Sequence, residues 1–250
     1  MHSPSVLTIL AALSLSLSVG CRPTPPEAPR RDLDGYAGDE EVGPEEPPPE
    51  IPADAPLVIF LGDSISAGLH LPASAAFPVR LQALLAARGA PFRLVNAGIS
   101  GDTSAGGLAR LDWLLDQEPD VLVVELGAND GLLGQPHKTL ERNLRAIVER
   151  TRARGIRVLV LGMRLPRNYG ESFTENFAEI YTRVVPVSGD DVRLLPFFME
   201  GVAGHEQFSL RDGLHPNAAG HRRLAENVAP MLEDWVRELR SAGDGERQGG

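Results

Sequence analysis

After Pro56 the chain alternates short, mostly apolar runs with longer stretches of helical periodicity, and this alternation constrains the fold more than any other feature. The first apolar run is Leu57–Leu61, which is typical of a strand covered on both faces. Residues 77–87 follow with apolar side chains on one helical face and Gly89 beyond the end. Strands that alternate with helices predict a mostly parallel sheet with helices on both faces.

The same alternation continues along the rest of the chain. Further strands are expected at 92–95, 121–124, 156–161 and 192–195, and further helices at 108–115, at 140–148 with an end near Gly155, and at 217–240. The last helix is expected to be interrupted or restarted at Pro230, because proline removes a backbone donor and crowds the preceding turn. The pattern therefore predicts an α/β fold, a three-layer α/β/α sandwich around a five-stranded parallel sheet.

The N-terminal segment is typical of an exported protein. Val6–Val19 is an uncharged run of mostly apolar and hydroxyl residues, too short to span a bilayer but suited to the core of a signal peptide. The sole cysteine, Cys21, follows Gly20 as in the lipobox of bacterial lipoproteins, where the thiol is lipidated. Ser18 stands where leucine is usual and no Lys or Arg precedes the apolar run, so ordinary secretion with nearby cleavage is the alternative. If Cys21 is lipidated, Arg22 favours the outer membrane.

A stretch rich in proline and glutamate separates this segment from the folded part. Residues 43–50 are its most biased portion, and prolines with like charges favour an extended, solvated chain. Many of the acidic residues behind the net charge of −10 lie in this stretch. This charge balance argues against a nucleic-acid partner, which would require a basic face. The expected organisation is a signal peptide over 1–20, a disordered tether over 21–54, a single domain over 55–240 and a flexible tail over 241–250.

Four polar segments follow the first, second, third and fifth expected strands. They are Gly62–Ser66, Ser100–Thr103, Gly127–Asp130 and Asp212–Pro216. Because the strands are parallel, all four segments should lie at the same edge of the sheet. Ligands bind at this edge in open α/β sheets, where the strand order reverses.

Ser64 and His215 are the expected nucleophile and base. A serine hydroxyl is a weak nucleophile until a base removes its proton, and Asp212 is close enough in sequence to orient the imidazole through Nδ1–H. Taken alone, Ser64 could be a turn or helix-cap residue, and the Asp-x-x-His segment could be a solvated loop. A metal site at these residues would lack a third ligand motif. The other histidines are expected in the leader, at the surface or in structural roles: His2, His70, His137, His205 and His221.

Acyl transfer also needs donors for the developing oxyanion. Gly101 can supply a backbone N–H, Asn129 a side-chain amide and Ser64 its own N–H, although a single loop glycine or asparagine is usually a turn residue. Three neighbouring acids are expected to accept hydrogen bonds in loops and helix caps: Asp63, Asp102 and Asp130.

These segments resemble the blocks of the SGNH (GDSL-type) hydrolases, which are named for their Ser, Gly, Asn and His. Residues 164–170, 194–200 and 212–217 extend the likeness to the periplasmic multifunctional thioesterase, lysophospholipase and arylesterase subgroup, over about residues 57–238. The resemblance implies a flavodoxin-like fold without a metal or a cofactor. It also implies a triad and an oxyanion hole, formed by Ser64, Asp212 and His215 and by Ser64, Gly101 and Asn129.

By analogy with the family, the loop at 130–136 would lie beside the acyl pocket. Leu132 and Leu133 could line that pocket, or they could pack on the following helix. The expected protein is a monomeric, periplasmic serine hydrolase that cleaves a small-molecule or lipid acyl ester or thioester and is anchored to the outer membrane through Cys21. A carbohydrate O-deacetylase of the same fold and a non-catalytic lipid- or glycan-binding lipoprotein are the alternatives. A decayed enzyme should have lost at least one of the site residues.

Overall fold

A computed structural model describes residues 50–248 other than 186 and 188. The expected signal peptide, Cys21 and nearly all of the expected tether lie outside the described residues. Within the described part of the chain, no helix combines the length and the apolar character needed to cross a membrane.

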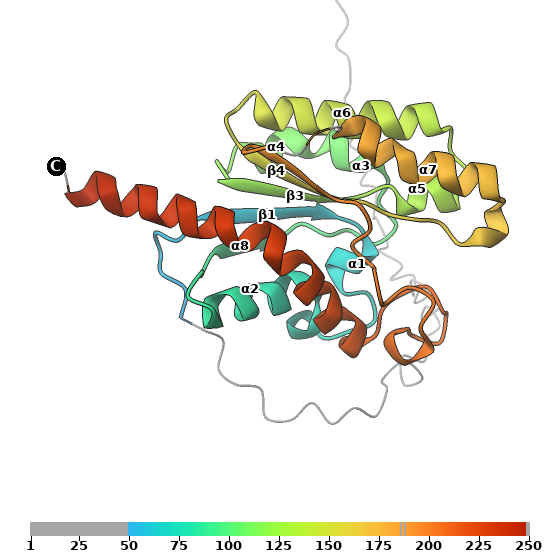
Figure 1. Cartoon of the computed structure of the whole chain (residues 1–250), viewed down its shortest axis with the longest axis horizontal. Helices are drawn as coiled ribbons and strands as arrows, with labels where there is room; N and C mark the ends of the chain where they lie inside the picture. Colours follow the sequence, from blue (N-terminus) through green and yellow to red (C-terminus); the bar gives the residue numbers. More distant parts are fainter. Residues whose placement is uncertain (1–49, 186, 188, 249–250) are drawn as a thin grey trace, which may run out of the picture. The chain divides into compact units, whose positions relative to one another are not determined.

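Five parallel strands form one sheet in the order β2-β1-β3-β4-β5 (Figure 1). The strands are β1 (Leu57–Gly62), β2 (Arg93–Asn96), β3 (Val121–Glu125), β4 (Arg157–Leu161) and β5 (Val192–Leu195). In register, Ile59 of β1 lies between Val95 of β2 and Leu122 of β3. The chain goes outward from β1 to β2 and returns past β1 to β3, so the strand order reverses between β1 and β3. The predicted α/β fold with a parallel five-stranded sheet is confirmed.

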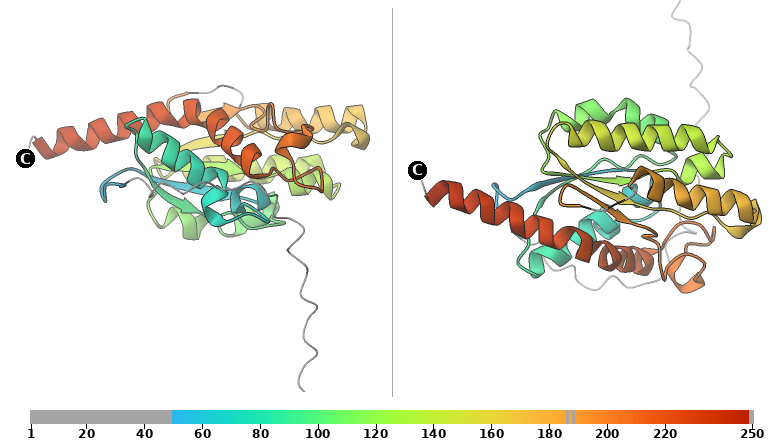
Figure 2. Two further views of the ribbon diagram at one scale, coloured as in Figure 1. Left: turned by 90° about the horizontal axis from the view of Figure 1, so that it is seen from below. Right: turned by 45° about the horizontal axis from the view of Figure 1, so that its top comes forward.

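Helices cover both faces of the sheet (Figures 1 and 2). One face carries α2 (Phe77–Ala87) and α8 (Ala218–Gln248), and the other carries α3 (Ser104–Ala109), α4 (Leu111–Leu115), α6 (His137–Arg152) and α7 (Glu171–Val184). Two short helices, α1 (Ser64–Ala67) and α5 (Ala128–Leu132), begin just beyond the carboxyl ends of β1 and β3. In the part of the chain that the structure describes, 3₁₀ helices lie at Ala73–Ala75, Arg167–Tyr169 and Glu206–Phe208.

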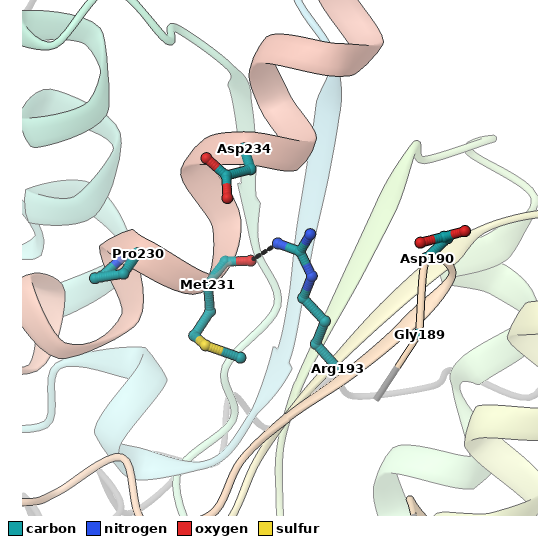
Figure 3. A pocket seen from close by; sticks show the side chains of 6 residues that line it. All are labelled: Gly189, Asp190, Arg193, Pro230, Met231 and Asp234. Carbon is teal, nitrogen blue, oxygen red and sulfur yellow. Dashed lines mark hydrogen bonds between the residues drawn. The ribbon is translucent and has the colours of Figure 1, made fainter. Parts of the chain in front are cut away.

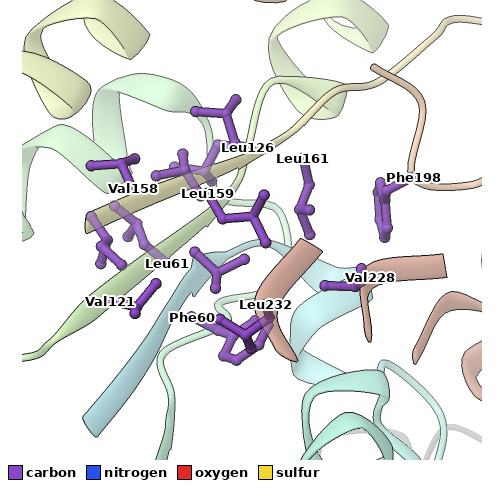
Figure 4. Close-up of a cluster of buried hydrophobic side chains, with 14 of the residues drawn as sticks. Phe60, Leu61, Val121, Leu126, Val158, Leu159, Leu161, Phe198, Val228 and Leu232 are labelled. Atoms are coloured by element: carbon purple, nitrogen blue, oxygen red, sulfur yellow. The ribbon is translucent and has the colours of Figure 1, made fainter. Parts of the chain in front are cut away.

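The core explains why the central strands β1 and β3 are almost entirely apolar. Every residue of β1 and β3 is buried, because alternate side chains meet helices on opposite faces. Phe60 packs edge-on against Phe77 of α2, with ring centroids 5.7 Å apart. Leu61 and Leu126 lie near Gly107 of α3, on the other face. Figure 4 shows this packing continuing across the sheet to Phe198 and α8.

The predicted helix over 108–115 is wrong in its extent. The structure has two helices, α3 and α4, which meet at Arg110. Helix α3 begins earlier, where the Thr103 hydroxyl accepts a hydrogen bond from the Gly106 N–H at 3.4 Å. Gly106 and Gly107 lower the intrinsic helical propensity of this segment and conceal its start in the sequence. Helix α7 was not predicted at all.

The predicted break at Pro230 is also wrong, because α8 continues through it and on to Gln248, past the expected domain end at residue 240. Leu224, Val228 and Leu232 of α8 are fully buried. Arg193 of β5 donates to the Met231 carbonyl oxygen at 2.7 Å beside a hollow of about 440 Å³ (Figure 3). Such packing offsets the roughly 3 kcal/mol that an interior proline costs a helix.

Candidate active site

Ser64 begins α1 directly after β1 and is nearly buried, with 8% of its surface exposed. Asp63 is the N-cap of this helix, and its Oδ1 accepts the Ile65 N–H at 3.0 Å. The cap turns the chain sharply at the end of the strand and presents the Ser64 side chain at the carboxyl edge of the sheet.

The hydroxyl of Ser64, the His215 ring and the Asp212 carboxylate form a continuous hydrogen-bonded chain. Ser64 Oγ lies 3.0 Å from His215 Nε2, although the two residues are 151 positions apart in the sequence. His215 Nδ1 lies 2.6 Å from Asp212 Oδ2. When Nδ1 carries its proton toward the carboxylate, Nε2 is the acceptor that faces the Ser64 hydroxyl. This geometry lets the imidazole take the hydroxyl proton.

Asp212 and His215 share one tight turn. Asp212 Oδ1 accepts the backbone N–H groups of Leu214 and His215, both at 2.9 Å. The Leu210 N–H donates to the His215 carbonyl oxygen at 2.8 Å and closes the loop. Burial alone would raise the pKa of Asp212, but the hydrogen bonds from His215 and Leu214 outweigh it and lower that pKa below 3.8. The carboxylate is therefore ionised at neutral pH and orients the ring.

The Asn129 amide joins the loops that follow three strands. Its Nδ2 donates to the Asp102 carbonyl oxygen at 2.8 Å and to Asp63 Oδ2 at 3.1 Å. Gly101 immediately precedes Asp102 and has φ +82°, a conformation that favours glycine. Among the described residues, neither the Gly101 N–H nor the Ser64 N–H reaches a protein acceptor. All three predicted oxyanion donors thus lie on loops that Asn129 connects.

Two further networks hold these loops in place. Arg110 binds the Asp102 carboxylate at 2.8 Å and also donates to the carbonyl oxygens of Ala97 and Gly62, at 2.6 and 3.1 Å. In the second network, Asp130 accepts hydrogen bonds from the N–H and the hydroxyl of Ser104 at 2.8 and 2.6 Å, and Asn143 donates to the same hydroxyl at 3.0 Å. Asp63, Asp102 and Asp130 therefore all accept hydrogen bonds, as the sequence predicted.

An apolar cleft of about 580 Å³ opens beside Ser64 and His215. Its apolar side chains come from the loops after β1, β3, β4 and β5: Ile65, Leu132, Met163, Leu165, Phe197, Met199 and Leu214. Leu132 lines the cleft, whereas Leu133 is 69% exposed and is not among the lining residues. A role in substrate binding stays a prediction for both leucines, with geometric support for Leu132 alone.

Of the remaining histidines, His221 has the best-defined environment. His221 is buried, and its Nδ1 accepts the Phe77 N–H at 3.0 Å. Burial, with smaller contributions from the charges of His215 and Arg80, lowers the pKa of His221 to about 4. Among the described residues, no three His, Cys, Asp or Glu side chains are grouped as a metal site would require.

Sequence reasoning assigned no role to Glu125, Ser66, Ser104, Arg110 or Asn143. Glu125 carried a readable signal, because it is an acid at the end of an otherwise apolar strand. The other four gave no such signal, since their partners are brought close only by the fold. The structure places Glu125 directly beneath the turn that carries Ser64.

Comparisons with known proteins agree with this geometry. Residues 60–223 match the GDSL-like Lipase/Acylhydrolase family. Esterase TesA of Pseudomonas aeruginosa is 47% identical over 182 residues, which cover 72% of this chain and 90% of that protein. Thioesterase 1/protease 1/lysophospholipase L1 of Escherichia coli strain K12 is 44% identical over 186 residues, covering 74% and 86%. A crystal structure of TesA has a TM-score of 0.66 at 47% identity, covering 70% of this chain and 97% of that one.

Proposed function

The chain belongs to the GDSL-like lipase/acylhydrolase family and is an esterase of that type, and from this premise we propose that it cleaves acyl esters or thioesters through an acyl-enzyme on Ser64. The observation that carries the proposal is the chain of contacts from Ser64 Oγ through His215 to Asp212, at 3.0 and 2.6 Å. A hydroxyl, a base and an ionised carboxylate in this order are the parts that serine hydrolysis needs.

In the first half of the reaction, Ser64 Oγ attacks the acyl carbon and its proton passes to His215 Nε2. Asp212 stabilises the imidazolium that results. The oxyanion accepts hydrogen bonds from the N–H groups of Ser64 and Gly101 and from Asn129 Nδ2, whose bond to Asp63 it replaces. His215 then gives its proton to the departing alcohol or thiol, and the acyl group remains on Ser64.

In the second half, water attacks the acyl carbon while His215 removes its proton. The same oxyanion donors stabilise the second tetrahedral intermediate. Collapse of that intermediate releases the carboxylic acid, and His215 returns a proton to Ser64 Oγ. The enzyme is then ready for another cycle.

The cleft favours an apolar acyl chain. Its lining is dominated by leucine, methionine, isoleucine and phenylalanine side chains, and burying each methylene in such a site contributes about 0.8 kcal/mol. A carbohydrate O-deacetylase would need polar groups for the sugar and little room for an acyl chain. We therefore favour fatty or aryl acyl substrates over acetylated carbohydrates.

Hydrolysis of p-nitrophenyl esters from acetate to palmitate tests this proposal. We expect activity that rises with chain length beyond acetate and disappears in Ser64→Ala, and a fluorophosphonate that labels the native protein but not this variant. Ser172→Ala, an exposed serine of α7, is the matched control. Activity confined to acetate would favour deacetylation. Full activity in Ser64→Ala would exclude the mechanism, and a folded, unlabelled and inactive native protein would favour a binding role.

The proposal includes export and anchoring. The uncharged segment Val6–Val19, the following Cys21 and the Pro/Glu-rich stretch support a periplasmic enzyme tied to the outer membrane by a lipidated cysteine. Incorporation of radiolabelled palmitate, lost in Cys21→Ala, is the expected result. Secretion of the native chain without incorporated palmitate would contradict lipid anchoring and favour ordinary cleavage of the signal peptide.

A further inference from the structure

Glu125 is a carboxyl group buried in the core without a role in the steps above. It is the last residue of β3 and is 0% exposed. Burial, together with the negative charge of Asp63, raises the pKa of Glu125 well above its ordinary value. Burying a polar group is costly unless hydrogen bonds compensate, so the partners of this side chain indicate what it does.

The donors to one of its oxygens all come from the turn that carries the nucleophile. Glu125 Oε2 accepts the Asp63 N–H at 3.2 Å, the Ser66 N–H at 3.1 Å and the Ser66 hydroxyl at 2.7 Å. These donors flank Ser64 on both sides. The turn therefore wraps around a single oxygen atom that belongs to the neighbouring strand.

The neighbouring backbone is shaped to admit this oxygen. Gly62 is the register partner of Glu125 across β1 and β3. A Cβ atom at Gly62 would lie 2.0 Å from Ser66 Oγ and 2.7 Å from Glu125 Oε2. The glycine that opens the Gly-Asp-Ser motif is thus required by the space that Glu125 and Ser66 occupy.

We propose that Glu125 is a positioning residue for the nucleophile: its Oε2 fixes residues 63–66 and so sets the Ser64 hydroxyl and N–H relative to His215. The inference rests on the proposed function of Ser64. Strand β3 lies in the interior of the sheet, so Glu125 transmits the rigidity of the sheet to the turn. A displacement of about 1 Å at reacting groups can cost on the order of 100-fold in rate.

Replacing Glu125 tests the inference. We expect Glu125→Ala to lower kcat on p-nitrophenyl butyrate on the order of 100-fold, to leave KM within roughly twofold, and to slow fluorophosphonate labelling of Ser64 in parallel. Glu125→Gln keeps the shape of the side chain and an acceptor oxygen, so it should retain kcat within about threefold. Ile147→Ala, a core change in α6, controls for lost stability and should leave kcat unchanged below its unfolding temperature.

Two results would overturn the inference: near-native kcat in folded Glu125→Ala, or a loss in Glu125→Gln as large as in Glu125→Ala. If Glu125→Ala does not fold, Ser66→Ala replaces it, because it removes the shortest bond to Oε2 and leaves the carboxyl in place. That variant should lose about tenfold in kcat at unchanged KM, and an unchanged kcat would overturn the inference too. Absence of Ser64-dependent hydrolysis in the native protein would instead refute the proposed function.

Discussion

The side-chain amide of Asn129 donates to the carbonyl oxygen of Asp102 at 2.8 Å, which joins the loop after β3 to the loop after β2. The same amide reaches Asp63 in the loop after β1. Because these loops start from different strands of one sheet, their relative position follows from the strand register. The loops that carry the oxyanion donors are therefore held in place before a substrate arrives, and fixed donors are more effective than mobile ones.

Replacing Asn129 by alanine should lower kcat by roughly 100-fold or more, since one oxyanion donor is lost. Steady-state kinetics on p-nitrophenyl butyrate measure the effect. Asn176→Ala, whose amide bonds only within α7, is the matched control and should behave as the native protein does. A small change in Asn129→Ala would remove this residue from the oxyanion hole.

Asp212→Asn should reduce kcat by about three to four orders of magnitude, because the amide no longer selects the His215 tautomer that accepts the Ser64 proton. Thermal unfolding should change little by comparison, since the loop is partly exposed. Asp116→Asn alters a surface acid paired with Arg154 and controls for loss of charge. Comparable activity in both variants would contradict the triad.

Leu132→Trp should lower kcat/KM for the palmitoyl ester far more than for the acetyl ester, because the larger ring fills part of the acyl cleft. Leu133→Trp adds the same ring one position away, on a side chain that is 69% exposed, and should leave the chain-length profile unchanged. Comparing the chain-length profiles of the two variants shows which of these leucines lines the cleft. Equal effects would mean that the loop as a whole, rather than Leu132, determines chain length.

Asp63 should make stability depend on pH. Burial, opposed by the bond from Ile65, raises the pKa of Asp63 from 3.8 to about 6. The folded state then holds a proton that the unfolded state releases between these values, so this contribution is present below about pH 4 and is lost as the pH rises through about 6. Its upper bound is about 3 kcal/mol. The free energy of unfolding of the native protein, measured in urea, should exceed that of Asp63→Asn by more at pH 5 than at pH 8. A difference that does not change with pH would refute the raised pKa.

Strands β1 and β3 were predictable because both are covered on both faces. Leu57 to Leu61 and Val121 to Val124 have no polar side chain that would permit a solvated face, and β1 and β3 are buried throughout. Helix α7 could also have been found, because Phe177, Ile180, Tyr181 and Val184 recur with helical spacing. The split of the segment at Arg110 could not be predicted in this way, since Arg110 contacts Ala97 and Gly62 only in the folded chain.

The candidate site divides in the same way. Ser64, Asn129 and His215 were predictable because their chemistry and their positions after strands are both visible in the sequence. Glu125 was visible only as an anomaly, since its effect depends on the register that places it opposite Gly62. The continuity of α8 through Pro230 likewise depends on the burial of neighbouring side chains in the core. Local helix propensity does not account for such burial.

The turn that holds Asp212 and His215 has one more consequence. Base and carboxylate are separated by two residues, so their mutual geometry survives small movements of the rest of the molecule. The contact of His215 with Ser64 instead joins opposite ends of the domain sequence. On warming, catalysis should therefore fade when this loop undocks, while the circular dichroism of the sheet and helices is still native. Heat inactivation of the enzyme would then report a local opening rather than the melting of its core.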